Sequence, residues 1–258
     1  MDDTLSAELI ARDLNTRVVG RRVEYLERVG STNDVAAQFA DAGDAEGLVV
    51  IADEQTQGRG RMKRAWLAPA HSSLLLSILF RPRARHAQIA MAVALGASKG
   101  ITKEIKRAVQ LKWPNDLLLN GKKCAGILTE AKTIGDKIEY VIAGVGVNVN
   151  FHAADLPDIP RAATTLSDEL DAFIPRVQLA QSILRGIDDY YARFSGGTDL
   201  DSEWKARLAT IGQRVRAQIE SRIEEGIAEN VDREGALLLR RADGTIAKLI
   251  AGDVTLIA

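Results

Sequence analysis

The sequence is poor in several residue types, and each scarcity excludes a class of protein. A single cysteine, Cys124, permits no disulfide within the chain, which indicates a reducing compartment and predicts a cytoplasmic protein. The histidines are far apart and lack metal-ligand spacing, so no residue is assigned to a metal site: His71, His86 and His152. No apolar run approaches the ~18 residues that span a membrane, and the acidic start of the chain is unlike a signal peptide.

The chain also has little net charge. Lys and Arg number 34 and Asp and Glu number 35, which gives a net charge of −1 at pH 7. A protein with this balance is not expected to bind nucleic acid or membrane surfaces through its overall charge. Its 258 residues are 46% hydrophobic and 27% charged, which is ordinary for a globular protein with one large domain or a domain plus a small module.

One stretch is nonetheless strongly basic. This basic loop, Asp53–Trp66, lies between the strand-like runs Gly47–Ala52 and Ser73–Phe80 and contains two glycines and four cations: Gly58, Gly60, Arg59, Arg61, Lys63 and Arg64. Such a segment cannot bury itself, so we expect a mobile surface loop. Glycines let a backbone approach a ligand, and arginines offer forked donors to carboxylate or phosphate. A solvated basic hairpin explains the loop alone equally well, whereas a Walker A loop is excluded because no Gly-Lys-Ser/Thr follows.

The first two hundred residues have the pattern of a mixed α/β domain. Helices are expected within residues 1–20 and at Asp34–Ala42, Arg85–Arg107, Thr164–Leu170, Pro175–Phe194 and Leu200–Leu208. Further strands are expected at Arg22–Val29, Val109–Trp113, Asp116–Leu119, Lys123–Ala131 and Lys137–Asn150, with a hairpin turn at Asn120-Gly121. Successive hairpins predict an antiparallel-rich sheet with packed helices, an α+β fold rather than repeated βαβ units.

The end of the chain has a different pattern. Short β-runs follow one another closely at Val215–Ile219, Gly226–Asp232, Ala236–Arg240 and Thr245–Ala251. Closely spaced short strands are typical of a small barrel. We therefore place a boundary near Thr210, which divides the chain into residues 1–209 and 210–258.

Four further motifs stand at strand ends or turns, where functional sites are usually built. They are Gly30–Asn33, Lys112–Asp116 (KWPND), Gly121–Leu128 (GKKCAGIL) and Gly144–Asn150 (GVGVNVN). Singly, they are explained as a helix cap, a turn, a hairpin and close packing in a sheet. Together with GRGR and the following tryptophan, in this order, they resemble biotin–protein ligases, from about Tyr25 to the end of the chain. The resemblance implies a class II synthetase-like catalytic domain followed by a small SH3-like β-barrel.

The resemblance also implies a reaction. Biotin and Mg-ATP give biotinyl-5′-adenylate and pyrophosphate, and a lysine of a biotin carboxyl carrier protein then takes the biotinyl group. Mg²⁺ is the implied cofactor, a homodimer formed through the central sheet is expected, and no nucleic acid or membrane partner is expected. Residues 1–20 are too short for the helix-turn-helix of some family members, which favours a ligase that is not a repressor.

Roles of individual residues follow from the same resemblance. It implies that biotin's ureido ring and neighbouring groups are held by Ser31, Thr32, Asn33 and Gln55. It places Gly58, Arg59, Gly60 and Arg61 in a closing loop, with Arg59 at the biotin carboxylate or the α-phosphate. It assigns Lys123 to the reacting oxygens, Trp66 to adenine, Asn148 to the adenosine end, and Asp116 to magnesium or the incoming lysine. Room for the ligand is expected at Gly126, Gly144 and Gly146.

Some features leave alternatives open. Lys63 stands where the family often has glycine, which affects the expected shape of the loop. Without the resemblance, Lys123 would be interpreted as one of two exposed hairpin lysines. A core tryptophan is the alternative interpretation of Trp66. Cys124 is interpreted as a packed apolar residue rather than a nucleophile. A lipoate–protein ligase or octanoyltransferase of the same superfold is the nearest alternative, and a nucleic-acid-binding protein using the basic loop and tail is another.

Overall fold

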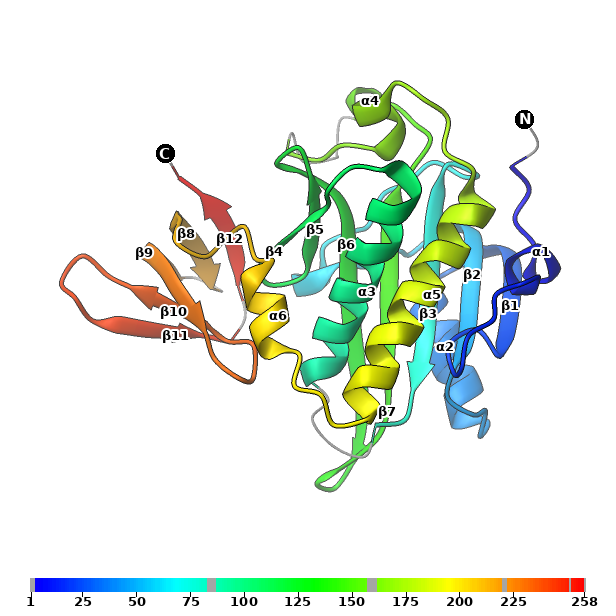
Figure 1. The fold of residues 1–258 in the computed structure, drawn as a ribbon, viewed down its shortest axis with the longest axis horizontal. Coiled ribbons are helices and arrows are strands. Elements are labelled where there is room, and N and C mark those ends of the chain that lie inside the picture. Colours follow the sequence, from blue (N-terminus) through cyan, green and yellow to red (C-terminus); the bar gives the residue numbers. More distant parts are fainter. Residues whose placement is uncertain (1–2, 83–86, 157–161, 220–221, 251, 258) are drawn as a thin grey trace.

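The structure is a computed structural model that describes residues 3–82, 87–156, 162–219, 222–250 and 252–257. A large sheet carries helices on both faces, and a smaller sheet lies beside it (Figure 1). Within the described residues, none of the helices is both long and apolar enough to span a membrane.

The large sheet has seven strands in the order β1-β2-β3-β7-β6-β5-β4. Their bounds are Arg22–Val29 (β1), Leu48–Gln55 (β2), Ser73–Phe80 (β3), Gln110–Lys112 (β4), Asp116–Leu119 (β5), Lys122–Ile134 (β6) and Lys137–Asn148 (β7). β1 and β2 pair in parallel, and every other pair is antiparallel. The predicted antiparallel-rich, mixed sheet is therefore confirmed.

Both faces of the central strands are apolar because each face is covered by helices. In β2, Val49 and Ile51 belong to the large core beneath the helical layer, whereas Leu48 and Val50 pack with a second cluster on the opposite face. This division follows from the alternation of side chains along a strand. The helices are Ala7–Ala11 (α1), Thr32–Asp41 (α2), Ala87–Ile105 (α3), Leu166–Leu170 (α4), Arg176–Ser195 (α5) and Asp201–Ala206 (α6), with short 3₁₀ turns at Arg61–Lys63 (η1) and Ala153–Asp155 (η2).

Helices α3 and α5 lie side by side over the sheet (Figure 1). Glycines permit this close approach: a Cβ on Gly96 would lie 2.4 Å from the Cα of Ile187, and one on Gly186 would lie 2.3 Å from the carbonyl oxygen of Gly96. The start of the predicted Arg85–Arg107 helix falls partly at residues 83–86, outside the described residues.

The small sheet is antiparallel, with the order β11-β10-β9-β8-β12. Its strands are Arg214–Ile219 (β8), Arg222–Val231 (β9), Leu237–Arg240 (β10), Ile246–Leu249 (β11) and Asp253–Leu256 (β12). Within the described residues β11 and β12 form the two edges, so the predicted small SH3-like domain is present but is not a closed barrel. The predicted β-runs ended at Ala251 and so did not include β12.

Two differences concern the boundaries of predicted strands. β2 continues through Asp53 to Gln55, because its parallel pairing with β1 extends to Val29↔Gln55. The irregular part of the basic loop therefore begins at Thr56. The hairpin strand β6 likewise extends to Ile134, beyond the predicted end at Ala131, since β7 pairs with it along this length.

Candidate active site

A cavity of about 490 Å³ opens above β6 and β7, between the start of α2, the basic loop, the KWPND turn and β12. Of the residues predicted for the site, Gly58 alone does not line this cavity. Those that line it are Ser31, Thr32, Asn33, Gln55, Arg59, Gly60, Arg61, Trp66, Asp116, Lys123, Gly126, Gly144, Gly146 and Asn148. Folding thus brings together motifs that are widely separated in the sequence.

Glycines form the floor of the cavity. Gly126 of β6 pairs with Gly146 of β7, and the indole of Trp66 lies over both. A Cβ on Gly146 would lie 2.6 Å from the indole, and one on Gly126 would lie 2.9 Å from it. Any side chain at these two positions would displace the ring, so the floor requires glycine. Trp66 is half-buried against this floor rather than a core residue.

A chain of hydrogen bonds lines one end of the cavity. Gln55 Oε1 accepts the N–H of Thr32 at 2.8 Å and its hydroxyl at 3.0 Å. The hydroxyl of Ser77, on β3, lies 2.7 Å from Thr32 Oγ1 and 2.6 Å from Asn33 Oδ1. Asn33 Nδ2 donates to Glu130 on β6 at 2.5 Å, which fixes the orientation of its amide. Donors and acceptors therefore alternate along a buried wall.

Helix capping does not explain this wall. Ser31 is the N-cap residue of α2, but its side chain makes no capping hydrogen bond. Ser31, Thr32 and Asn33 are nevertheless all buried. Buried hydroxyl and amide groups need polar partners. Their positions on the cavity wall suit a ligand that presents both N–H and carbonyl groups.

Lys123 extends into the cavity because of a β-bulge. The pairing of β5 with β6 shifts register between Leu117 and Leu118, so an extra residue enters β6. Residues three apart normally face opposite sides of a strand, but the bulge brings Lys123 Nζ close to the face of Gly126. Nζ lies 2.6 Å from Asp116 Oδ1 and 5.6 Å from the centre of the Trp66 ring.

The neighbouring lysine differs in position. The side chain of Lys122 is 55% exposed and pairs with Glu169, whereas that of Lys123 is 33% exposed. The two hairpin lysines are therefore not equivalent. Cys124, which follows them, is fully buried, and this burial raises the pKa of its thiol to about 12. A thiol of this kind stays protonated at neutral pH, as expected for a packing residue.

The KWPND turn is held from both sides. Asn115 Nδ2 donates to the carbonyl of Ile127 at 2.5 Å, and the N–H of Ile127 donates back to the carbonyl of Asn115 at 2.9 Å. The buried indole of Trp113 donates through Nε1, at 2.8 Å, to the carbonyl of Gly235 in the turn between β9 and β10 of the small sheet. Trp113 and Asn115 thus fix the turn that presents Asp116 and tie it to the tail.

The basic loop folds back on itself. Trp66 N–H donates to Gly58 O at 2.9 Å, and Gly60 N–H donates to Arg64 O at 2.7 Å. Between these bonds Arg59 and Ala65 form an antiparallel bridge. The guanidinium of Arg59 makes a bidentate ion pair with Asp34, at 2.7 and 2.5 Å. These hydrogen bonds lower the pKa of Asp34 and raise that of Arg59.

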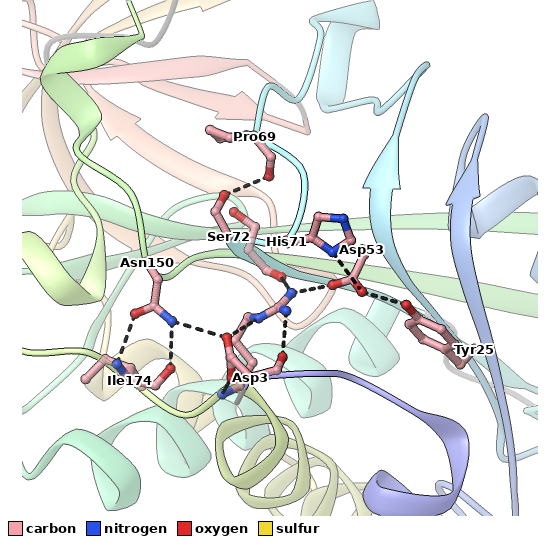
Figure 2. A network of polar contacts seen from close by, with 10 residues as sticks. Asp3, Tyr25, Asp53, Pro69, His71, Ser72, Asn150 and Ile174 are labelled. Atoms are coloured by element: carbon pink, nitrogen blue, oxygen red, sulfur yellow. Dashed lines mark hydrogen bonds and ion pairs between the residues drawn. The ribbon is translucent and has the colours of Figure 1, made fainter. Parts of the chain in front are cut away.

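The strands that flank the loop are tied to a buried ionic network (Figure 2). Arg176, at the start of α5, donates to Asp53 Oδ1 at 2.5 Å and to the carbonyl of Ser73 at 3.1 Å. Its Nε donates to Asp3 at 2.5 Å. Asp53 also accepts the hydroxyl of Tyr25 at 2.6 Å and lies 3.3 Å from Nδ1 of His71. The network fixes the strand that enters the loop and the strand that leaves it.

The side chain of Asn148 is bonded to a backbone group outside the predicted site. It is buried at the end of β7, and its Nδ2 donates to the carbonyl of Thr164 at 3.0 Å. Within the described residues, no cluster of three or more acidic, histidine or cysteine side chains could hold a metal ion.

Comparisons with known families and proteins bear directly on this cavity. Residues 25–148 match the model of the Biotin/lipoate A/B protein ligase family, and residues 210–256 match that of the Biotin protein ligase C terminal domain. A Biotin--[acetyl-CoA-carboxylase] ligase of Mycobacterium tuberculosis is 33% identical, over 98% of this chain and 97% of its own length. The Bifunctional ligase/repressor BirA of Bacillus subtilis is 34% identical, over 98% of this chain and 79% of its own length. The chain belongs to the biotin protein ligase family.

The fold agrees with solved biotin ligases. A biotin protein ligase from Aquifex aeolicus, solved in complex with biotin and ATP, has a TM-score of 0.75 and 24% identity, over 92% of this chain and 99% of that one. The predicted α+β fold with an SH3-like tail is confirmed, apart from barrel closure. As a biotin ligase this chain is an enzyme, and the family match spans every motif that lines the floor and walls of the cavity.

The sequence did not single out several residues in and around the cavity. Ser77 and Glu130 complete the hydrogen-bonded wall, Asp34 holds Arg59, and β12 contributes Val254, Thr255 and Leu256 to the rim. One signal was available, because Ser77 interrupts the apolar run of its strand. No such signal marked Glu130 and Asp34, since charged residues at those positions are typical of a solvated surface.

Proposed function

We propose that this ligase activates biotin with ATP as biotinyl-5′-adenylate and transfers the biotinyl group to a lysine of a biotin carboxyl carrier protein. One observation carries the proposal: Lys123, paired with Asp116, lies in a single cavity with a glycine floor and a wall of alternating donors and acceptors. Adenylation must bring a carboxylate and a triphosphate together, which requires positive charge fixed before the reaction.

The polar wall provides the biotin end of the site. A ureido ring presents one carbonyl acceptor and two N–H donors. Ser31, Thr32 and Asn33 offer hydroxyl and amide groups of both kinds, and Gln55 and Ser77 fix their orientation. A site built to satisfy those groups discriminates strongly against an acyl chain that lacks them, because its buried polar groups are then left unpaired. This favours biotin over lipoate or octanoate.

The cationic part of the cavity provides the reacting end. Lys123 stabilises the charge that develops on the carboxylate and the α-phosphate, and Arg61 lies on the same cavity wall. The indole of Trp66 offers a face for adenine, and its Nε1 is buried without a hydrogen-bond partner within the described residues. That N–H is available to a ligand. Asn148 contributes at the adenosine end.

Magnesium fits this site as a companion of the nucleotide. Mg²⁺ is commonly held by one or two carboxylates together with substrate phosphates and water. Asp116 is the carboxylate on this wall, and no larger cluster of protein ligands exists among the described residues. When bound, the ion neutralises phosphate charge.

The two parts of the chain divide the work in this proposal. Residues 1–209 bind and activate biotin, and residues 210–258 close the nucleotide side of the cavity with β12 and contribute to carrier transfer. We place the enzyme in the cytoplasm, as a homodimer paired through the central sheet, without nucleic acid or membrane partners. Analytical ultracentrifugation tests the dimer.

Transfer to a carrier domain tests the proposed function. The purified ligase is incubated with ATP, Mg²⁺, a biotin carboxyl carrier domain and, in turn, biotin, lipoate or octanoate. The expected result is a carrier that gains one biotinyl group and no other acyl group, as measured by mass spectrometry. A carrier whose acceptor lysine is replaced by arginine is the control. Lipoyl or octanoyl transfer in place of biotinyl transfer would overturn the proposal.

A further inference from the structure

A bidentate ion pair joins the basic loop to the start of α2. Arg59 Nη1 and Nη2 donate to the two carboxylate oxygens of Asp34, at 2.7 and 2.5 Å. Asp34 lies in the first turn of α2, directly after the Ser31, Thr32 and Asn33 that line the cavity. The attachment point is therefore continuous with the proposed biotin site.

Holding Arg59 holds the opposite arm of the loop as well. Arg59 is bridged to Ala65, and the neighbouring bond joins Gly58 to Trp66. Trp66 in turn covers Gly126 and Gly146 on the cavity floor. The ion pair at α2 is thus connected, through the two arms of the loop, to the indole above β6 and β7.

A second contact links this ion pair to the cavity wall. Arg59 Nη2 lies 3.7 Å from Glu130 Oε1, and the other oxygen of Glu130 accepts the amide of Asn33. A ligand that hydrogen-bonds Asn33 therefore acts on a side chain connected to Arg59 through one carboxylate. This short path connects the loop to the polar wall.

We infer that Asp34 is a positioning residue that docks the basic loop over the cavity. In this arrangement Arg59 holds the loop to α2 and does not bind the substrate anion directly. This inference rests on the proposed function. The side chains of Arg59 and Asp34 are 35% and 51% exposed, so water weakens their pair. A weak ion pair suits a loop that must open to admit the substrate and to release the activated product to a carrier.

An accidental surface ion pair is the competing explanation, and the same helix provides a matched control. Asp41, in the last turn of α2, pairs with Lys132 at 2.8 Å and accepts the hydroxyl of Tyr140, far along the helix from the loop. Asp41→Asn removes an aspartate ion pair of comparable exposure from α2 without touching the loop.

Limited trypsin digestion of the ligand-free enzyme is the first measurement. Trypsin cleaves after the basic residues of the loop, and mass spectrometry locates the cuts. Asp34→Asn should raise the cleavage rate within the loop by roughly two- to fivefold, the range for a half-exposed ion pair. Asp34→Glu should be cleaved at a rate between those of Asp34→Asn and the wild type. Asp41→Asn should be cleaved at the wild-type rate. Equal cleavage in Asp34→Asn and the wild type would overturn the inference.

A double-mutant comparison tests whether Asp34 acts through Arg59. In an Arg59→Gln background, Asp34→Asn should cause no further increase in cleavage, because the partner is already lost. Additive effects would show that Asp34 acts on the helix instead. Melting temperatures of Asp34→Asn and Asp41→Asn, measured alongside, report any general loss of stability.

Escape of the activated intermediate is the functional readout. With biotin and ATP present, Asp34→Asn should label lysines of an unrelated bystander protein at roughly two to five times the wild-type rate. An Asp34→Asn variant that increases cleavage of the loop but leaves bystander labelling at the wild-type rate would show that Asp34 holds the loop only in the ligand-free enzyme. That result would contradict a role in docking the loop over the intermediate. A wild type that forms no adenylate would refute the proposed function. The trypsin comparison would still test whether Asp34 holds the basic loop.

Discussion

Arg176 and Asp53 form an ion pair of 2.5 Å although 123 positions separate them in the chain. Their side chains are 2% and 3% exposed, and Arg176 also bonds Asp3 and the backbone of Ser73. The pair joins the start of α5 to the end of β2, two residues before Gln55 in the cavity wall. A buried guanidinium with this many acceptors sets the frame from which the basic loop leaves and returns.

Removing Arg176 should destabilise the whole enzyme. Arg176→Ala leaves the carboxylate of Asp53 buried without its cation, which typically costs about 3–5 kcal/mol. Arg193→Ala is the control on the same helix, because the Arg193 side chain is 44% exposed and its pair with Glu203 should contribute about 1 kcal/mol or less. Urea denaturation measures both free energies of unfolding. Similar losses in the two variants would contradict the importance assigned to the buried network.

The phenol of Tyr25 should lose its proton only at unusually high pH. Burial, followed by the hydrogen bond to Asp53, raises the pKa of its phenol to about 12. Because the folded pKa lies above the unfolded value of about 10, the stabilisation is fully present below pH ~10 and is lost as the pH rises toward ~12. The ultraviolet absorbance of tyrosinate is followed against pH in the wild type and in Tyr25→Phe. The titration of the variant should lack one step near pH 12. A missing step near pH 10 would show that the phenol is unperturbed.

A methyl group at Gly144 should damage the wall that we propose binds biotin. Its Cβ would lie 2.4 Å from Asn33 Oδ1, which would break the bond to Ser77 and disturb the wall. Losing such buried hydrogen bonds costs about 1–3 kcal/mol, so Gly144→Ala should weaken biotin binding roughly ten- to a hundredfold in calorimetry. The control is Gly30→Ala, whose Cβ meets nothing closer than 3.9 Å. Equal affinities in both variants would remove Asn33 from the binding site.

Lys123 should matter for chemistry more than for folding. Lys123→Ala should lower pyrophosphate release with biotin and ATP on the order of 10²–10³-fold, because it removes the cation that we propose faces the developing charge. Its melting temperature should change little. Lys122→Ala, which removes the neighbouring exposed lysine paired with Glu169, should release pyrophosphate at nearly the wild-type rate. Comparable rates in the two variants would exclude Lys123 from the mechanism.

Sequence patterns sufficed for elements whose cause is local. Alternating apolar residues and the Asn120-Gly121 turn predicted β5, β6 and β7, and the ordered motifs predicted which strand ends meet at the cavity. Features set by pairing between distant segments were missed. The bulge opposite Leu117 and Leu118, which turns Lys123 into the cavity, depends on register between strands and leaves no mark in composition.

The same limit applies to charged partners. Arg176 looks like an ordinary helical arginine in sequence, because its partners Asp3 and Asp53 are far away in the chain. Arg59 was assigned to the substrate from its motif, whereas the structure pairs it with Asp34, a residue without any motif of its own. β12 was missed because it is short and pairs with β8, nearly forty residues earlier.

The most direct test of the account is the activation step alone. The wild-type ligase is mixed with ATP, Mg²⁺ and biotin without a carrier, and pyrophosphate release is followed together with the mass of any bound product. We predict release in proportion to the enzyme and retention of biotinyl-5′-adenylate, with little release when lipoate or octanoate replaces biotin. No release with biotin, or faster release with either other acid, would contradict the assignment of this cavity to biotin activation.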